Sequence, residues 1–198
     1  MRLCAFQVHL TGGSADHITI NWASNSTLVT PNSTLQYAVA GSGVWSTATG
    51  PPGEIYSTLM DPRYPKTEGG CEGGANYTNP SCYYTSPTLH AVALPPLLSS
   101  TKYEFTIGGR AFKMATPPAA GADAITFGVV GDLGQTKNST ATVAALTAEA
   151  AAGSIDVLLH AGDLSYADGD GYRWDSYGRM MENLSSAIPV ASVGGTWG

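Results

Sequence analysis

The sequence has few charged residues and no cluster of basic ones. Only 12% of its 198 residues are charged, with 9 Lys or Arg against 15 Asp or Glu, and the formal net charge is −6. Proteins that bind a nucleic-acid backbone need a surface of Lys and Arg side chains that neutralises phosphates. We therefore expect no nucleic acid among the partners of this protein. The hydrophobic content of 43% is ordinary for a folded domain and too high for a disordered chain.

Long apolar runs are also missing. No stretch approaches the roughly 20 apolar residues that a helix needs to cross a bilayer, so we expect no membrane span. The first ten residues, MRLCAFQVHL, contain an apolar stretch too short for a secretory signal peptide. Two explanations stay open: the natural start precedes this Met, or the sequence begins at a mature end.

Cysteine is scarce, with only Cys4, Cys71 and Cys82 in the chain. No CxxC motif or nearby histidine completes a structural zinc site. Cys71 and Cys82 bracket a polar loop inside a Gly-rich, insertion-like segment, 61–87. We predict a disulfide between them, which would stabilise the fold by about 2–3 kcal/mol if it is unstrained. Cys4 is left over, either free or buried.

Sequons for N-linked glycosylation occur at five asparagines. Each is an Asn-x-Ser/Thr triplet without proline at the middle position. Together with the predicted disulfide, they favour a glycoprotein that is secreted, extracellular or vacuolar. The five are Asn25, Asn32, Asn76, Asn138 and Asn183.

The N-terminal part, 1–116, has the pattern of a β-sandwich. Apolar and polar residues alternate in several short segments, which is typical of half-buried antiparallel strands. About seven such strands separated by Gly, Ser and Pro turns indicate a sandwich of two sheets. The predicted inward-facing residues of three strands are Ile18, Ile20 and Trp22; Leu35, Tyr37 and Val39; and Tyr103, Phe105 and Ile107.

One spacing refines this prediction. Leu97, Thr101 and Tyr103 form the pattern L-x-x-x-T-x-Y, which precedes a late strand in fibronectin type III-like sandwiches. A simple turn before an amphipathic strand gives the same pattern, so both interpretations stay open at this point.

After a Pro-, Gly- and Ala-rich linker, 117–124, the pattern changes. Segments 125–130 (ITFGVV) and 155–161 (IDVLLHA) are continuous apolar runs, as expected of strands covered on both faces. An Ala-rich segment between them predicts a helix, with Ser139 or Thr140 as its N-cap and Gly153 at its end. A second helix is predicted over 170–188 and a third strand over 189–195. The part 125–198 is therefore predicted to be a parallel αβ domain.

Two aspartates follow the two predicted parallel strands directly. Asp132 lies in the segment GDLG and Asp163 in GDLSYAD, and each stands at the carboxyl end of its strand. Ligands of parallel sheets bind at this edge, and hard cations prefer carboxylate oxygens. A single aspartate here would be explained as a helix cap. A matching pair, with Tyr166 three residues after the second, predicts a metal site instead.

These motifs resemble those of the purple acid phosphatases, within the calcineurin-like metallophosphoesterases. The matching residues are D-L-G at Asp132 to Gly134 and G-D-L-S-Y at Gly162 to Tyr166. The segments QVHLTGG and SSTKYEFTIGG are also similar to the β-domain of that family. The resemblance implies a fibronectin type III-like β-sandwich over 1–116, followed by a partial metallophosphoesterase domain over 125–198.

The resemblance also implies a dinuclear metal site that hydrolyses phosphate monoesters. By position, Asp132 would bind Fe(III), Asp163 would bridge it to a second divalent metal (Zn, Mn or Fe), and Tyr166 would bind iron as a phenolate. Such a phenolate gives the violet colour of the family. The substrate would be a phosphate ester, with N-linked glycans on the surface.

The sequence departs from the family where the next metal ligands should follow. The family has G-N-H-E or G-N-H-D, whereas this chain has Gly195 and Thr196 in place of the Asn and the His. None of the four histidines, His9, His17, His90 and His160, replaces the later ligands, and His160 is predicted to be a hydrogen-bonded core residue.

Only half of the ligands would then be present. We therefore predict that this chain alone is inactive, and we assign a catalytic role to none of its residues. Two explanations stay open: a shortened form of a longer enzyme, or a natural end at Gly198. An unfinished sheet would also expose an edge and a face, which another chain or a second copy would cover. The alternative function is a non-catalytic secreted glycoprotein derived from a phosphatase and used for assembly or adhesion.

Overall fold

The computed structural model describes residues 5–12, 14–25, 32–59, 83–121 and 124–194. Three groups of predictions concern residues outside these ranges: the Cys71–Cys82 disulfide with the remaining Cys4, the sequon at Asn76, and the substituted ligand positions Gly195 and Thr196. They therefore stay predictions. None of the helices in the described ranges is long and apolar enough to span a membrane.

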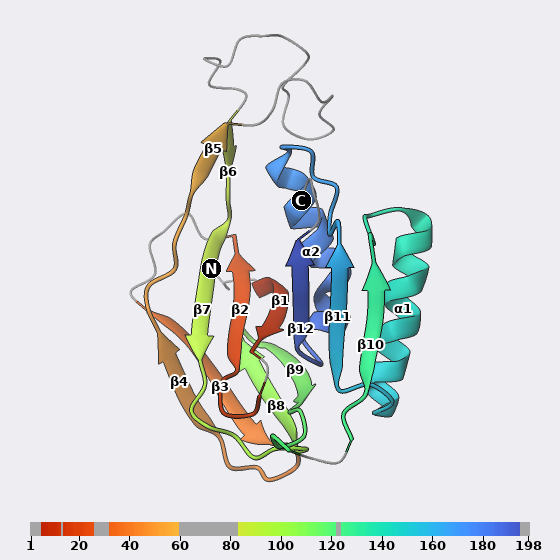
Figure 1. The fold of residues 1–198 in the computed structure, drawn as a ribbon. Helices are drawn as coiled ribbons and strands as arrows, with labels where there is room; N and C mark the ends of the chain where they lie inside the picture. The colour runs from red at the N-terminus through yellow and green to blue at the C-terminus, as the bar shows by residue number, and fades with distance from the viewer. Residues whose placement is uncertain (1–4, 13, 26–31, 60–82, 122–123, 195–198) are drawn as a thin grey trace.

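Two antiparallel sheets pack face to face in the N-terminal part (Figure 1). One has the order β1 (Ala5–Thr11), β2 (Thr19–Ser24), β7 (Thr88–Ala93). The other has the order β4 (Ser46–Gly50), β3 (Ser33–Val39), β8 (Lys102–Ile107), β9 (Arg110–Ala115). A separate two-stranded ribbon joins β5 (Ser57–Leu59) to β6 (Tyr83–Thr85).

The core between these sheets contains most of the predicted inward-facing side chains. Ile20, Trp22 and Phe105 are buried there, as the alternation of apolar residues predicts. The prediction is wrong at Val39, which is 38% exposed, whereas Ala38 is buried instead. The alternation in β3 shifts at its end, because β3 continues directly into the turn at residues 40 and 41.

A parallel three-stranded sheet follows in the order β10 (Phe127–Gly131), β11 (Val157–Gly162), β12 (Val190–Gly194). The predicted linker, 117–124, lies between β9 and β10. The helices α1 (Lys137–Ala152) and α2 (Gly171–Ser185) connect the three strands. The predicted order of parallel strands connected by helices is therefore confirmed.

The predicted N-cap of α1 is wrong, although the predicted end at Gly153 is correct. Thr136 is the N-cap, and its hydroxyl accepts a hydrogen bond from the backbone of Ser139. In return, Oγ of Ser139 accepts a hydrogen bond from the backbone N–H of Thr136, at 2.9 Å, and its hydroxyl donates to the carbonyl of Leu133. Both side chains are thus used in a capping box, which moves the helix start one turn toward the sheet.

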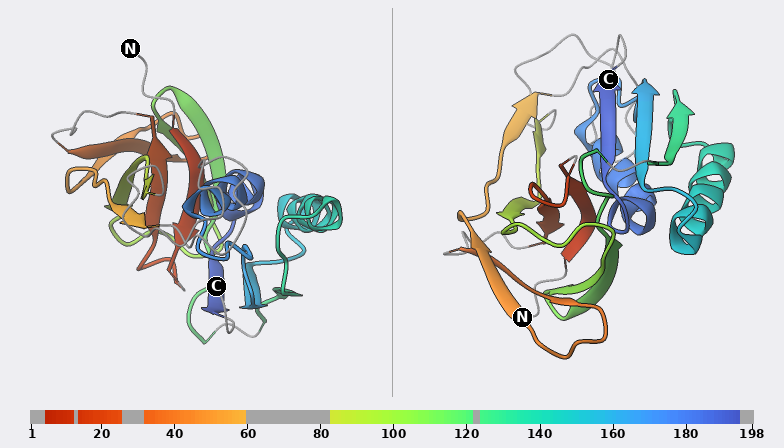
Figure 2. Two further views of the ribbon diagram at one scale, coloured as in Figure 1. Left: turned by 90° about the horizontal axis from the view of Figure 1, so that it is seen from above. Right: turned by 60° about the horizontal axis from the view of Figure 1, so that its bottom comes forward.

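Both helices cover the same face of the parallel sheet, as Figure 2 shows in the view from above. The opposite face carries Phe127 and Val129 from β10 and Val193 from β12, and their side chains are 45%, 69% and 73% exposed. Parallel sheets normally have both faces covered. Within the described ranges, no helix lies on this face.

Helix α2 packs against strand β1 of the sandwich as well as against the parallel sheet. Glu182 of α2 forms an ion pair with Arg110 of β9, and it accepts a hydrogen bond from the backbone N–H of Val8, at 3.3 Å. Ser185 donates its hydroxyl to the carbonyl of Val8, at 3.1 Å. Polar groups of α2 therefore satisfy backbone groups of the sandwich at a buried contact.

Replacing Glu182 by alanine should weaken this contact. The change removes the acceptor of the Val8 N–H and of Arg110, so we expect the free energy of unfolding to fall by about 1–3 kcal/mol. Urea denaturation followed by circular dichroism measures it. Glu149→Ala, at an exposed position of α1, is the control and should change stability little. Equal losses in both variants would contradict this role of Glu182.

The uncovered sheet face should make the protein self-associate. Exposed apolar patches of this kind promote contacts between molecules, and Val129→Lys should reduce light scattering at high protein concentration. The control is Val44→Lys, because Val44 is also exposed, at 73%, but lies in the sandwich and not on the uncovered sheet face. A similar reduction in both variants, or a monomer at all concentrations, would exclude association through this face.

Candidate metal centre

Asp132 lies at the carboxyl end of β10 in an unusual backbone conformation. Its φ is +46°, a left-handed conformation that aspartate tolerates better than most residues. Its backbone N–H donates to the carbonyl of Ala161, at 3.0 Å. The chain therefore turns sharply at the strand end and leaves this carboxylate exposed.

Asp163 follows β11, the neighbouring strand, and contacts Asp132 directly. Its backbone N–H donates to Oδ1 of Asp132, at 2.8 Å. Gly162 makes this approach possible, because a Cβ at that position would lie 2.3 Å from the same Oδ1. The two aspartates that the sequence pairs are thus brought together at one edge of the sheet.

The side chain of Asp163 has an oxygen without a partner. Its Oδ1 is buried, and no hydrogen-bond donor among the described residues reaches it. A buried carboxylate oxygen in this state is unfavourable unless a cation or a donor satisfies it. A buried carboxylate oxygen without a hydrogen-bond partner is therefore consistent with a role of Asp163 as a metal ligand.

Tyr166 is the third predicted ligand, and it lies near both carboxylates. Its φ is +49°, and its side chain is 39% exposed. The pKa of its phenol is raised by partial desolvation and by the negative charges of Asp132 and Asp163. Gly134 leaves room for the ring, because a Cβ there would lie 3.0 Å from Cδ2 of Tyr166.

The loop that carries Tyr166 is held by hydrogen bonds from residues that the sequence did not predict to be part of the site. Gln135 donates from Nε2 to the carbonyls of Ser165 and Arg173, at 2.9 and 2.8 Å, and Ser176 donates to its Oε1. Arg173 donates to the carbonyl of Tyr166, at 2.7 Å. The sequence contains one hint of a role for Gln135, namely that it directly follows the DLG segment.

A cavity of about 500 Å³ opens beside these residues. Asp132 and Tyr166 line one part of it, and Arg173 lines another. The guanidinium of Arg173 also forms an ion pair with Asp168, at 3.0 Å. The cavity thus combines exposed oxygen donors with one positive group, which is a suitable environment for a metal ion and an anionic ligand.

The oxygen atoms of Asp132, Asp163 and Tyr166 are of the kind that a hard cation such as Fe(III) binds, because such ions prefer carboxylate and phenolate oxygen. Within the described ranges, no group of three or more His, Cys, Asp or Glu residues could hold a metal.

The described histidines do not supply the missing ligands. As predicted, His160 is buried in the core, where its Nδ1 lies 2.9 Å from the hydroxyl of Tyr177. Burial lowers the pKa of His160. His90 lies in the sandwich, with its ring nitrogens 2.9 Å from the hydroxyls of Ser24 and Ser33.

Several known proteins that are similar to this chain are named as phosphatases. Purple acid phosphatase 22 of Arabidopsis thaliana is 39% identical over 109 residues, which is 54% of this chain and 24% of the relative. Phosphoenolpyruvate phosphatase of Allium cepa is 43% identical over 122 residues, or 57% of this chain and 24% of the relative. Fe(3+)-Zn(2+) purple acid phosphatase 12 of A. thaliana is 41% identical over 115 residues, again 54% of this chain and 24% of the relative. The chain spans about a quarter of the length of the curated relatives it matches.

The fold has a counterpart among solved structures, although no protein-family profile matches the chain. Purple acid phosphatase PPD1 from yellow lupin seeds superposes with a TM-score of 0.69 at 18% identity, covering 98% of this chain and 35% of that one. At this identity the match shows a common fold. The sequence matches and this fold together confirm the resemblance predicted from the sequence: the chain is similar to the purple acid phosphatases in sequence and in fold.

Proposed function

We propose that this chain forms the iron-binding half of a dinuclear phosphatase site that hydrolyses phosphate monoesters. One observation carries the proposal: Asp132, Asp163 and Tyr166 converge at the carboxyl ends of two adjacent parallel strands. The sequence relatives are named as phosphatases, which supports the same chemistry here. One of them is named for an iron and zinc pair.

Each of the three residues has a proposed role. Asp132 and Tyr166 would bind a ferric ion, and Asp163, whose Oδ1 lacks a partner among the described residues, would be shared with a divalent ion (Zn, Mn or Fe). A bound metal pair would act as a Lewis acid on the phosphate ester. Gln135 and Arg173 hold the backbone of the loop that carries Tyr166, through the carbonyls of Ser165 and Tyr166.

The second ion needs ligands that the described residues do not provide. We therefore propose that the chain by itself binds iron but does not turn over phosphate esters. Activity would require ligands from elsewhere, for example from another chain on the uncovered side of the sheet. The affinity for one ion with three oxygen ligands should accordingly be modest.

The finer features of the fold belong to the same proposal. We infer a fibronectin type III-like sandwich, because the hydroxyl of Tyr103 accepts a hydrogen bond from the backbone N–H of Leu98, at 3.0 Å. A tyrosine bonded back to the chain just upstream is a feature of such sandwiches. The three-stranded parallel sheet, covered on one face, would be a partial metallophosphoesterase domain.

Glycosylation and a secreted or vacuolar location are also proposed. The four sequon asparagines in the described ranges have exposed side chains, as attachment of a glycan requires. They are Asn25, Asn32, Asn138 and Asn183.

Iron binding tests the proposal directly. Titration with Fe(III) should give about one bound ion per chain and a visible charge-transfer band from the Tyr166 phenolate. Tyr166→Phe should abolish the band while leaving weakened iron binding, and Asp132→Asn should weaken the binding itself. Metal analysis after dialysis and absorption spectroscopy measure the two effects.

Two controls separate this site from adventitious iron. Tyr37→Phe changes a tyrosine in β3, and Asp16→Asn removes an exposed carboxylate, so neither should affect the band. A band that survives Tyr166→Phe, or iron binding that is unchanged in Asp132→Asn, would refute the site. Hydrolysis of para-nitrophenyl phosphate by the isolated chain would refute the proposal that other ligands are required.

A further inference from the structure

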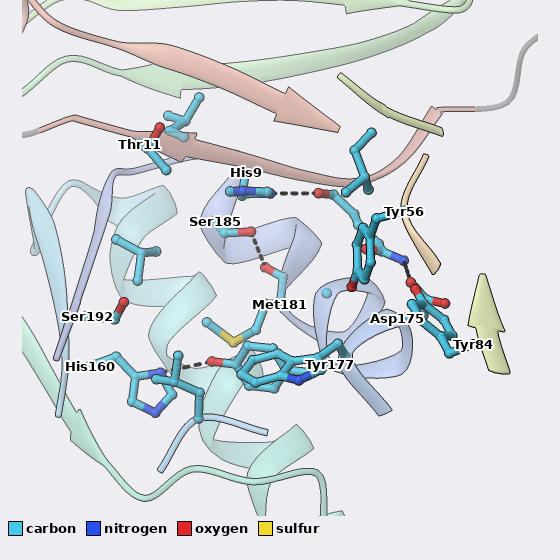
Figure 3. Close-up of a pocket in the computed structure, with 17 residues that line it drawn as sticks. His9, Thr11, Tyr56, Tyr84, His160, Asp175, Tyr177, Met181, Ser185 and Ser192 are labelled. Carbon is cyan, nitrogen blue, oxygen red and sulfur yellow. Dashed lines mark hydrogen bonds between the residues drawn. The ribbon is translucent and has the colours of Figure 1, made fainter. Parts of the chain in front are cut away.

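A second cavity, of about 450 Å³, lies where the sandwich meets α2 and the parallel sheet (Figure 3). Its walls come from β1, from α2, from strands β11 and β12, and from residues near the β5–β6 ribbon. It shares no lining residue with the cavity beside Asp132 and Tyr166. The proposed metal chemistry therefore does not account for it.

Four aromatic residues line this interdomain cavity: Tyr56, Tyr84, Trp174 and Tyr177. Tyr56 and Tyr84 meet edge to face with ring centroids 5.7 Å apart, and Trp174 and Tyr177 meet in the same way at 6.1 Å. Figure 3 shows Tyr56 and Tyr84 on one side of the cavity and Tyr177 on another. Aromatic faces carry negative electrostatic potential and attract cations.

The charge of the cavity is negative. Among the residues that line it, all of which are described, Asp175 is the one carboxylate, and there is no Lys or Arg. The pKa of the Tyr84 phenol is raised far above its ordinary value by burial and by the adjacent Asp175. A phosphate ester would be repelled here, whereas a positive group would be attracted by both the rings and the carboxylate.

The local backbone is arranged to place this carboxylate. Gln7 has a φ of +57° at an irregularity in the register of β1, and its Nε2 donates to Oδ1 of Asp175, at 2.9 Å. Gly178 of α2 permits this, because a Cβ there would lie 2.9 Å from the side-chain oxygen of Gln7. Strained residues of this kind tend to occur at binding sites.

We propose that the interdomain cavity binds a compact organic cation of the substituted-ammonium class. The aromatic walls contact its alkyl groups, and Asp175 compensates its charge. Most of the wall is apolar, so a small cation with an apolar surface fits better than a strongly hydrated metal ion. This site is independent of the proposed phosphatase function, because it uses none of the same residues.

Choline and its neutral analogue 3,3-dimethylbutan-1-ol test the proposal, because they have nearly the same shape and differ in charge. Isothermal titration calorimetry of the 198-residue chain should show saturable binding of choline and binding of the alcohol that is at least about tenfold weaker. Two-dimensional NMR should place the shifts at Trp174 and its neighbours. Asp175→Asn should weaken choline about tenfold, and this variant keeps the acceptor for Gln7.

Asp16→Asn is the matched control, since it removes the same charge at an exposed site of the sandwich and should leave choline binding unchanged. The proposal is overturned if choline does not bind saturably, or if the alcohol binds equally well to the unmodified protein. Both measurements need no variant, so a folding defect in Asp175→Asn cannot obscure them. Iron binding at Tyr166 should be unaffected by choline in either case.

Discussion

The contact between α2 and strand β1 holds the two halves of this protein in one arrangement. Its centre is Glu182, which pairs with Arg110 and accepts from the backbone of Val8. Glu182 is 8% exposed, so its charge is shielded from water and depends on these partners. The position of α2 then fixes what lies on either side of the helix.

Both sites depend on that placement. On one side, Arg173 and Ser176 of α2 bond to Gln135 and to the loop of Tyr166. On the other side, Asp175 receives the side chain of Gln7 from the sandwich. A shift of α2 along its axis would disturb the candidate metal centre and the aromatic cavity together.

Backbone strain is concentrated at the same places. Among the described residues, five that are not glycine have positive φ: Gln7, Ser100, Asp132, Tyr166 and Asp168. Three of them belong to the loops of the metal centre, and Gln7 lines the interdomain cavity. Such conformations are unfavourable by about 1–3 kcal/mol each and persist where surrounding contacts enforce them. At the metal centre, Gly162 and Gly134 leave room for the side chains of Asp132 and Tyr166.

The two cavities differ in electrostatic character although they lie on the same helix. Arg173 gives the cavity of the metal centre a positive group beside its oxygen donors. Asp175, two residues along, gives the interdomain cavity a negative one. Successive positions of a helix point in different directions, so α2 presents opposite charges to two separate cavities.

The sequence by itself determined the order of elements and which residues are the candidate metal ligands. Continuous apolar runs set β10 and β11 as parallel strands, and the aspartates that follow such strands must meet at one edge. The sequence could not place the start of α1, because Thr136 and Ser139 are both good caps; in the structure Thr136 is the N-cap and Ser139 is its partner three residues later. It also could not show that Ala38 replaces Val39 in the core, since the alternation shifts there at the end of β3.

Tertiary structure alone decided the rest. Gln7 and Asp175 are 168 residues apart in the chain, and nothing in either segment predicts their contact. The orphaned oxygen of Asp163, the bracing by Gln135 and Arg173, and the aromatic cavity likewise arise from packing between distant segments. Local sequence specifies strands, turns and ligand types, because these follow from short-range periodicity and backbone preference. Cavities and their charge follow from which surfaces are brought together, and that depends on the docking of α2.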